Sequence, residues 1–211
     1  MNEIELVSQS IQSIKICLLG NSGVGKSCIA HRYTDENFDE NQFSSEAAQC
    51  YSKVININGQ KLYLDIWDTA GQEKYRSLGR YFYKESYIII LVYDIGNQKS
   101  FNDLKNEWYN NVQQYGEQHT ILGVVGNKSD LYKDNGVPEK KVRKFAKDIN
   151  AEFMVVSAKT GHNINLLFEN LVRKYLDKDF QNKLKENERN NRQNFILNNN
   201  KEDQSSCCSK N

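Results

Sequence analysis

A glycine-rich segment has the residue types and spacing of a phosphate-binding loop. It reads Gly20-Asn21-Ser22-Gly23-Val24-Gly25-Lys26-Ser27 and fits the pattern G-x-x-x-x-G-K-[ST]. Its glycines let backbone N–H groups turn inward around phosphate oxygens, and the start of the following helix adds a positive dipole end. Lys26 is expected to reach the β- and γ-phosphates, and the Ser27 hydroxyl to ligate Mg²⁺. The loop indicates a nucleotide without indicating which base.

A second segment, Asn127-Lys128-Ser129-Asp130, has the chemistry to read guanine. It follows the apolar run 121–126, at the carboxyl end of a predicted strand, where α/β sheets bind ligands. The Asp130 carboxylate can accept from both N1–H and the 2-amino group of guanine. Adenine would leave that carboxylate unpaired, which is a strong form of discrimination. After a further apolar run comes Ser157-Ala158-Lys159, where the Ala158 N–H can donate to guanine O6.

A third segment, Asp68-Thr69-Ala70-Gly71-Gln72, has groups suited to sensing a γ-phosphate. Asp68 follows a predicted strand and is placed to hold Mg²⁺, through a water. Gly71 can bring its N–H close to the γ-phosphate, and Gln72 can orient an attacking water. The alternative for a lone acidic strand end is ordinary solvent exposure, which the other two motifs disfavour.

Alternating apolar runs and helical stripes are expected to position these segments. Strands are predicted over 14–19, 49–58, 61–67, 87–93, 121–126 and 152–156, with Asn58-Gly59 as a two-residue hairpin turn. Helices are predicted over 26–33, 100–115 with a cap at Ser100, 139–149, and from 164 onward. The pattern predicts an α/β fold of the P-loop NTPase class: a mostly parallel six-stranded sheet with one antiparallel edge strand and helices on both faces.

Composition narrows the class of protein. The chain has 211 residues, 38% of them hydrophobic, and a net charge of +1, which fits one globular domain with a tail and argues against a nucleic-acid binder. The longest apolar run is too short to span a bilayer, and residues 1–12 lack the apolar core of a secretory signal, so a cytosolic location is expected. Cys17, Cys28 and Cys50 lie in apolar stretches and are expected to be small buried thiols.

These motifs, in this order over roughly residues 12–178, resemble the Ras superfamily of small GTPases. The runs 67–78 and 91–95 and the pair Cys207-Cys208 are similar to the Rab branch, and the ending Cys-Cys-Ser-Lys-Asn is close to that of endocytic Rabs. The resemblance implies a monomeric switch that hydrolyses GTP to GDP with Mg²⁺ and regulates vesicle trafficking. It implies that Phe38 stacks on guanine and that the catalytic residues are Lys26, Gly71 and Gln72. The implied nucleotide-binding set is Ser22, Gly23, Val24, Gly25, Lys26, Ser27, Cys28, Phe38, Gly71, Asn127, Lys128, Asp130, Ser157, Ala158 and Lys159.

The chain departs from the Rab pattern in its first switch loop. Where that pattern has Thr, Ile and Gly, this sequence has Ser45, Glu46 and Ala47. Ser45 is the expected third metal ligand beside Ser27 and Asp68, with Ser44 as the alternative. The altered loop motivates a second hypothesis, a constitutive GTP-binding scaffold with little hydrolysis, against which the retained Gln72 argues. Asp130 argues against a P-loop kinase or ATPase.

The predicted organisation is an N-terminal extension (1–11), a GTPase domain (12–178) and a flexible tail (179–211). Cys207 and Cys208 resemble a Rab tail with two geranylgeranyl groups, the number that stable anchoring needs, and unmodified thiols are the alternative. By resemblance, the partners are an exchange factor, a GTPase-activating protein, a GDP-dissociation inhibitor and an escort protein. The expected location is the cytosolic face of an intracellular membrane, in exchange with the cytosol, with an endosomal membrane as one candidate.

Overall fold

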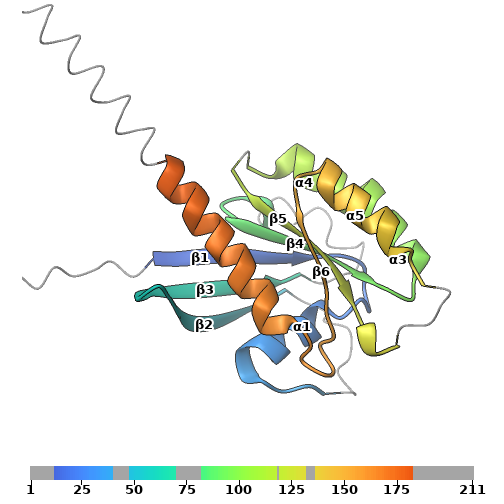
Figure 1. Ribbon diagram of the computed structural model, residues 1–211, viewed down its shortest axis with the longest axis horizontal. Coiled ribbons are helices and arrows are strands. Elements are labelled where there is room, and N and C mark those ends of the chain that lie inside the picture. The colour runs from blue at the N-terminus through green and yellow to red at the C-terminus, as the bar shows by residue number, and fades with distance from the viewer. Residues whose placement is uncertain (1–11, 40–47, 70–81, 118, 132–135, 183–211) are drawn as a thin grey trace, which may run out of the picture. The chain divides into compact units, whose positions relative to one another are not determined.

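A computed structural model of the chain describes residues 12–39, 48–69, 82–117, 119–131 and 136–182 (Figure 1). The chain divides into two compact units, the first ending at Val172 and the second beginning at Arg173. All described strands belong to the first unit. Within the described residues no helix is both long enough and apolar enough to cross a membrane.

The first unit is built on one six-stranded sheet. Its strands lie in the order β2-β3-β1-β4-β5-β6. Neighbouring strands are parallel, except that the edge strand β2 pairs with β3 in antiparallel orientation. This arrangement confirms the α/β class and the antiparallel edge strand expected from the sequence. The strand bounds are β1 Gln12–Leu19, β2 Gln49–Ile57, β3 Gln60–Asp68, β4 Ile88–Asp94, β5 Ile121–Asn127 and β6 Glu152–Val155.

The β2–β3 hairpin forms where the sequence predicts it. Asn58 and Gly59 have φ angles of 53° and 82°, the two positive values that a primed two-residue turn requires. Asn tolerates this left-handed conformation and Gly adopts it freely, so the turn fixes the strand register in which Ile57 pairs with Gln60. That register carries Asp68 to the end of β3, beside β1.

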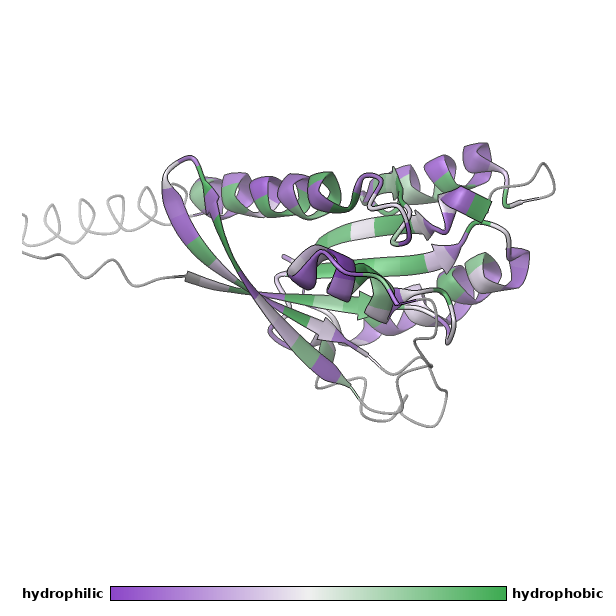
Figure 2. Cartoon of the chain, turned by 90° about the horizontal axis from the view of Figure 1, so that it is seen from below, coloured by the Kyte–Doolittle hydropathy of each residue, from purple (hydrophilic) through white to green (hydrophobic). Residues whose placement is uncertain are grey.

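Helices cover the sheet on both faces. They are α1 Lys26–Asp35, α3 Gln98–Asp103, a π-helical turn Leu104–Trp108, α4 Tyr109–Tyr115, α5 Glu139–Asp148, and residues 164–172 of a last helix. That helix continues to residue 182 in the second unit. In Figure 2 the central strands are mostly hydrophobic, whereas the helices alternate between hydrophobic and hydrophilic stripes. A strand buried on both faces needs a continuous apolar run, as β4 has, and a helix that covers it needs only one apolar face.

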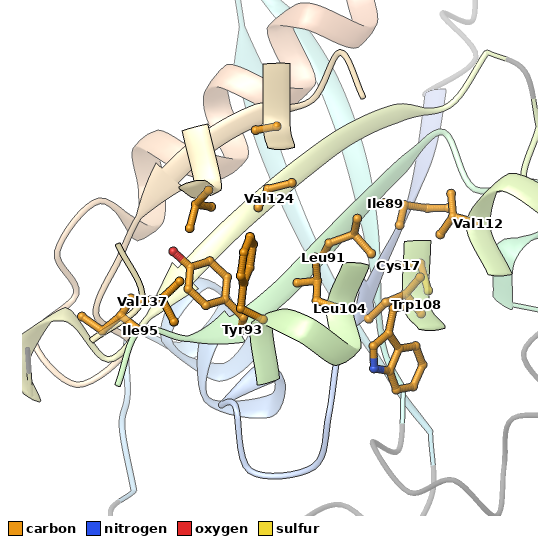
Figure 3. Close-up of a cluster of buried hydrophobic side chains, with 14 of the residues drawn as sticks. Cys17, Ile89, Leu91, Tyr93, Ile95, Leu104, Trp108, Val112, Val124 and Val137 are labelled. Atoms are coloured by element: carbon orange, nitrogen blue, oxygen red, sulfur yellow. The ribbon is translucent and has the colours of Figure 1, made fainter. Parts of the chain in front are cut away.

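One hydrophobic cluster fills the space between the sheet and the α3–α5 layer (Figure 3). Alternate strand residues point into it because successive side chains of a strand face opposite sides of the sheet. Cys17 of β1, Leu91 of β4 and Val124 of β5 are all fully buried there. The helices contribute Phe101, Leu104, Trp108, Val112, Val142 and Ala146. This layer holds the helix that follows β4 against the carboxyl ends of the central strands.

Two details of the α3 region differ from the sequence expectation. The cap is Asn97 and not Ser100: the Asn97 side chain accepts a hydrogen bond from the Ser100 N–H at 3.1 Å. The Ser100 hydroxyl instead donates to the Asn97 carbonyl at 2.7 Å, inside the first turn. The continuous α-helix expected over 100–115 is interrupted by the π-helical turn Leu104–Trp108.

The expectation of three buried thiols is wrong for two of them. Cys17 is buried, and burial raises the pKa of its thiol to about 12. Cys28 is only partly buried, and Cys50 is exposed. Cys50 lies on β2, the edge strand of the sheet, where apolar neighbours in sequence do not bring a covering layer.

Candidate functional site

The loop between β1 and α1 has little room for side chains at two of its glycines. A Cβ atom on Gly20 would lie 2.2 Å from the Val92 carbonyl oxygen, and one on Gly25 would lie 2.3 Å from Nδ2 of Asn127. Gly25 also has a φ of 94°, in the left-handed region that favours glycine. Both positions therefore bring loop backbone against the ends of β4 and β5, the neighbouring strands.

The start of α1 is suited to an anion. Gly25 caps the helix without any side-chain hydrogen bond, and the first turn contains no acidic residue. A helix start leaves backbone N–H groups without partners inside the helix, and the dipole makes them attractive to negative charge. The residue types and the local geometry agree with the phosphate role expected for residues 22–28.

Lys26 and Ser27 extend from this helix start toward the interior of the loop. The Lys26 ammonium donates to the carbonyls of Gly20 at 2.9 Å and Asn21 at 3.0 Å. The residue is 5% exposed, and burial lowers the pKa of Lys26 to about 8, while the nearby Asp68 carboxylate opposes that shift. The Ser27 hydroxyl donates to Oδ2 of Asp68 at 2.5 Å. A hydroxyl and a buried carboxylate so close together form an oxygen donor set that fits Mg²⁺.

Asn127 joins three of the expected loops through one side chain. Its Nδ2 donates to the Val24 carbonyl at 2.9 Å, and its Oδ1 accepts from the Ala158 N–H at 3.1 Å. The residue is 2% exposed, so both contacts are shielded from water. The end of β5 is thereby fixed against the β1–α1 loop and against the loop after β6.

The remaining residues of the expected base-reading set lie around Asn127. Asp130 accepts a hydrogen bond at Oδ1 from the Ser157 hydroxyl at 2.5 Å, which sets the orientation of its carboxylate. The Lys128 ammonium pairs with Oδ2 of Asp94 at 2.7 Å, and this carboxylate comes from the end of β4. Ala158 is buried and Lys159 is exposed. The ends of five strands that are neighbours in the sheet, β3, β1, β4, β5 and β6, thus supply groups to one edge of the sheet.

Phe38 follows the end of α1 and lies beside Arg32 of that helix. It is partly exposed, and the Arg32 guanidinium carbon stands 5.8 Å from the centre of its ring. Arg32 belongs to no motif of the sequence, and a basic residue in the last helical turn is a common match to the helix dipole.

A second contact that the sequence did not reveal reaches the phosphate loop from the α3 layer. The Trp108 indole Nε1–H donates to Oδ1 of Asn21 at 2.7 Å, and Asn21 donates through Nδ2 to Oδ2 of Asp103 at 2.6 Å. Trp108 is 6% exposed and belongs to the hydrophobic cluster, so a core side chain holds a residue of the loop.

Several expected site residues lie outside the described residues. They are Ser44, Ser45, Glu46 and Ala47 of the first switch loop, Gly71 and Gln72 of the third motif, and the pair Cys207 and Cys208. Their assigned roles stay predictions.

Comparisons with known proteins agree with this arrangement. A profile described as the Ras family matches residues 15–177. The Ras-related protein Rab-26 of Mus musculus is 38% identical over 157 residues, which are 74% of this chain and 60% of that protein. The human Ras-related protein Rab-22A is 37% identical over 165 residues, 78% of this chain and 84% of its own length. Human Rab-30 is 36% identical over 173 residues, 82% of this chain and 85% of its own. The chain therefore spans about three fifths of the length of Rab-26 and most of the other two.

Proposed function

This chain belongs to the Ras family as a Rab-type small GTPase, and from that premise we propose that it binds GTP and GDP, hydrolyses GTP, and acts as a switch in vesicle trafficking. The observation that carries the proposal is the Asn127 side chain, which ties the phosphate loop to the loop after β6. A nucleotide whose base is held between Asp130 and Ala158 would then have its phosphates directed toward the start of α1.

Guanine recognition is the task of the Asn127–Asp130 and Ser157–Lys159 segments. The Asp130 carboxylate accepts from N1–H and the 2-amino group, with the Ser157 hydroxyl at 2.5 Å holding it in place. The Ala158 N–H donates to O6, and Phe38 stacks on the base. A site built on paired polar groups rejects adenine because its own groups would lose their partners.

Phosphate binding and hydrolysis are the task of the β1–α1 loop and the third motif. Lys26 and the N–H groups at the start of α1 hold the β- and γ-phosphates, and Ser27 and Asp68 hold Mg²⁺, with Ser45 as a further ligand. Held by these residues, Mg²⁺ would supply positive charge to offset the negative charge that develops during phosphoryl transfer. Gln72 orients the attacking water and Gly71 donates to the γ-phosphate. An activating partner's arginine is expected to add about 10³–10⁵-fold to the rate.

The membrane part of the proposal rests on Cys207 and Cys208 as sites of two prenyl groups. They would hold the protein on the cytosolic face of an intracellular membrane, and an endosomal membrane is one candidate. The regulators proposed by family resemblance are an exchange factor, a GTPase-activating protein, a GDP-dissociation inhibitor and an escort protein.

Base specificity tests the proposed function directly. The full chain with Mg²⁺ should bind a fluorescent GDP analogue that excess GDP displaces and excess ATP does not, and it should release phosphate from GTP in a single turnover. Asp130→Asn should shift the preference from guanine toward xanthine by about 100-fold or more, because the xanthine C2 oxygen accepts from the new amide. Asp148→Asn, at the exposed end of α5, is the matched control and should keep guanine preference. If Asp130→Asn keeps its preference for guanine, the Asp130 carboxylate does not recognise the base.

A further inference from the structure

The guanidinium of Arg32 is bonded to three backbone carbonyls on two different segments. Nε donates to the Ala158 carbonyl and Nη2 to the Lys159 carbonyl, each at 2.7 Å. Nη1 donates to the Glu36 carbonyl, also at 2.7 Å. In Figure 1, α1 lies beside the segment that follows β6, so Arg32 spans the space between these two elements.

Contacts around Arg32 extend this connection on both sides. On one side, the Ala158 N–H is bonded to Asn127, so the backbone of Ala158 is held both at its N–H and at its carbonyl. On the other, Glu36 ends α1 with a left-handed φ of 57°, and Arg32 binds the carbonyl at this bend. The guanidinium also stands 5.8 Å from the Phe38 ring centre, within cation–π range.

We propose that Arg32 is a positioning residue for guanine recognition, which aligns the Ala158–Lys159 backbone with the Glu36–Phe38 segment so that both can meet the base. The inference rests on the proposed function, since Ala158 and Phe38 are the groups assigned to guanine O6 and to the face of the ring. Arg32 itself acts through these residues.

The donor geometry explains why this role needs arginine. A guanidinium presents its donors in one rigid plane, and here three of them point to carbonyls that come from two segments. A lysine ammonium keeps the charge but is a compact group on a flexible stem and cannot reproduce this planar fork. Loss of the fork should let the two segments move independently.

Release of GDP from the full chain measures this alignment. Arg32→Ala should release a fluorescent GDP analogue about tenfold faster or more, because it removes hydrogen bonds made by a charged group. Arg32→Lys should release it at an intermediate rate. Arg143→Ala is the matched control, because among the described residues Arg143 donates to Glu139 on α5 and lies over the Phe153 ring, and neither contact involves the backbone that Arg32 binds. Its release rate should equal that of the wild type.

A second readout separates positioning from a general loss of structure. The analogue 6-thio-GDP keeps N1–H and the 2-amino group but offers a poorer acceptor at position 6, so a well-placed Ala158 N–H should favour GDP over it. In Arg32→Ala the ratio of the two affinities should fall toward one, while Arg143→Ala should keep the wild-type ratio. Wild-type release in Arg32→Ala, or equal losses for both nucleotides, would overturn the proposal. If Arg32→Ala does not fold, Arg32→Lys gives the same two comparisons. Failure of the proposed function is distinct, because the wild-type chain itself would then not bind GDP.

Discussion

Asn127 illustrates how one side chain can determine whether separate loops form a site. Its amide has a donor end and an acceptor end, and the structure directs them to Val24 and Ala158. A buried aliphatic side chain could fill the space but could not distinguish these two directions. The polar amide therefore specifies the position of the loops, at the risk that a wrong replacement leaves buried groups without partners.

Asn127→Asp should destabilise the protein by about 1–3 kcal/mol and weaken GDP binding. A carboxylate oxygen would replace the donor Nδ2, so that two buried acceptors, this oxygen and the Val24 carbonyl, would face each other. Urea unfolding in excess GDP measures both effects together, because bound GDP adds to the unfolding free energy. Competition with a fluorescent GDP analogue measures the second alone, and the difference gives the first. Asn102→Asp, on the exposed side of α3, is the control and should change stability by less than about 0.5 kcal/mol. A similarly small change in Asn127→Asp would contradict the role of the amide.

At the scale of elements, sequence patterns predicted the parts whose signals are local. The apolar run of β4 and the Asn58-Gly59 turn identified a central strand and the hairpin, and both are present. The expected site segments are short and follow strands, so their common location follows from the direction of the parallel strands. Their side-chain contacts could not be predicted, because Arg32 and Ala158 are 126 positions apart and no pattern links them.

The π-helical turn escaped prediction for a different reason. Its apolar stripe, Phe101, Leu104, Trp108 and Val112, has spacings of three and four residues, which an ordinary α-helix also satisfies. Periodicity therefore cannot show the extra residue in the turn. The cap was ambiguous in the same way, since Asn97 and Ser100 are both good capping residues and only the contact between them decides.

The π-helical turn ends at Trp108, whose indole N–H reaches Asn21 of the phosphate loop. Trp108→Phe keeps an aromatic ring and removes the donor. In a double-mutant cycle with Asn21→Ala, unfolding free energies should show a coupling of about 0.5–1.5 kcal/mol, since the pair shares one hydrogen bond. The matched cycle uses Trp67→Phe, on β3, with Asn21→Ala and should be additive. If the Trp108 cycle is also additive within about 0.3 kcal/mol, the contact contributes nothing measurable.

At the scale of the whole molecule, the candidate site draws on residues from Gly20 to Lys159. It therefore depends on nearly the complete first unit. The strands that carry these residues are mostly parallel, and parallel neighbours are distant in sequence. The site therefore exists only when the sheet is complete, whereas the proposed membrane attachment depends on residues beyond it. Binding of nucleotide and binding of membrane should then be separable by mutation.

Cys207 and Cys208 allow that separation to be tested. Each prenyl chain contributes about 0.8 kcal/mol per buried CH₂ group, and a single chain gives only marginal, reversible attachment. We expect mass spectrometry of protein from its own cells to find isoprenoids in thioether linkage on both cysteines. Either single Cys→Ser variant should attach weakly in membrane fractionation, and the double variant should be in the soluble fraction, while all three keep wild-type GDP affinity.

Cys50→Ser is the matched control, because Cys50 is an exposed thiol on β2 that the proposal leaves unmodified. It should fractionate with membranes as the wild type does. An unshifted mass for the peptide that contains both cysteines would disprove the lipid anchor. Wild-type GDP binding by the double variant would then still support the switch, because the two activities reside in different parts of the chain.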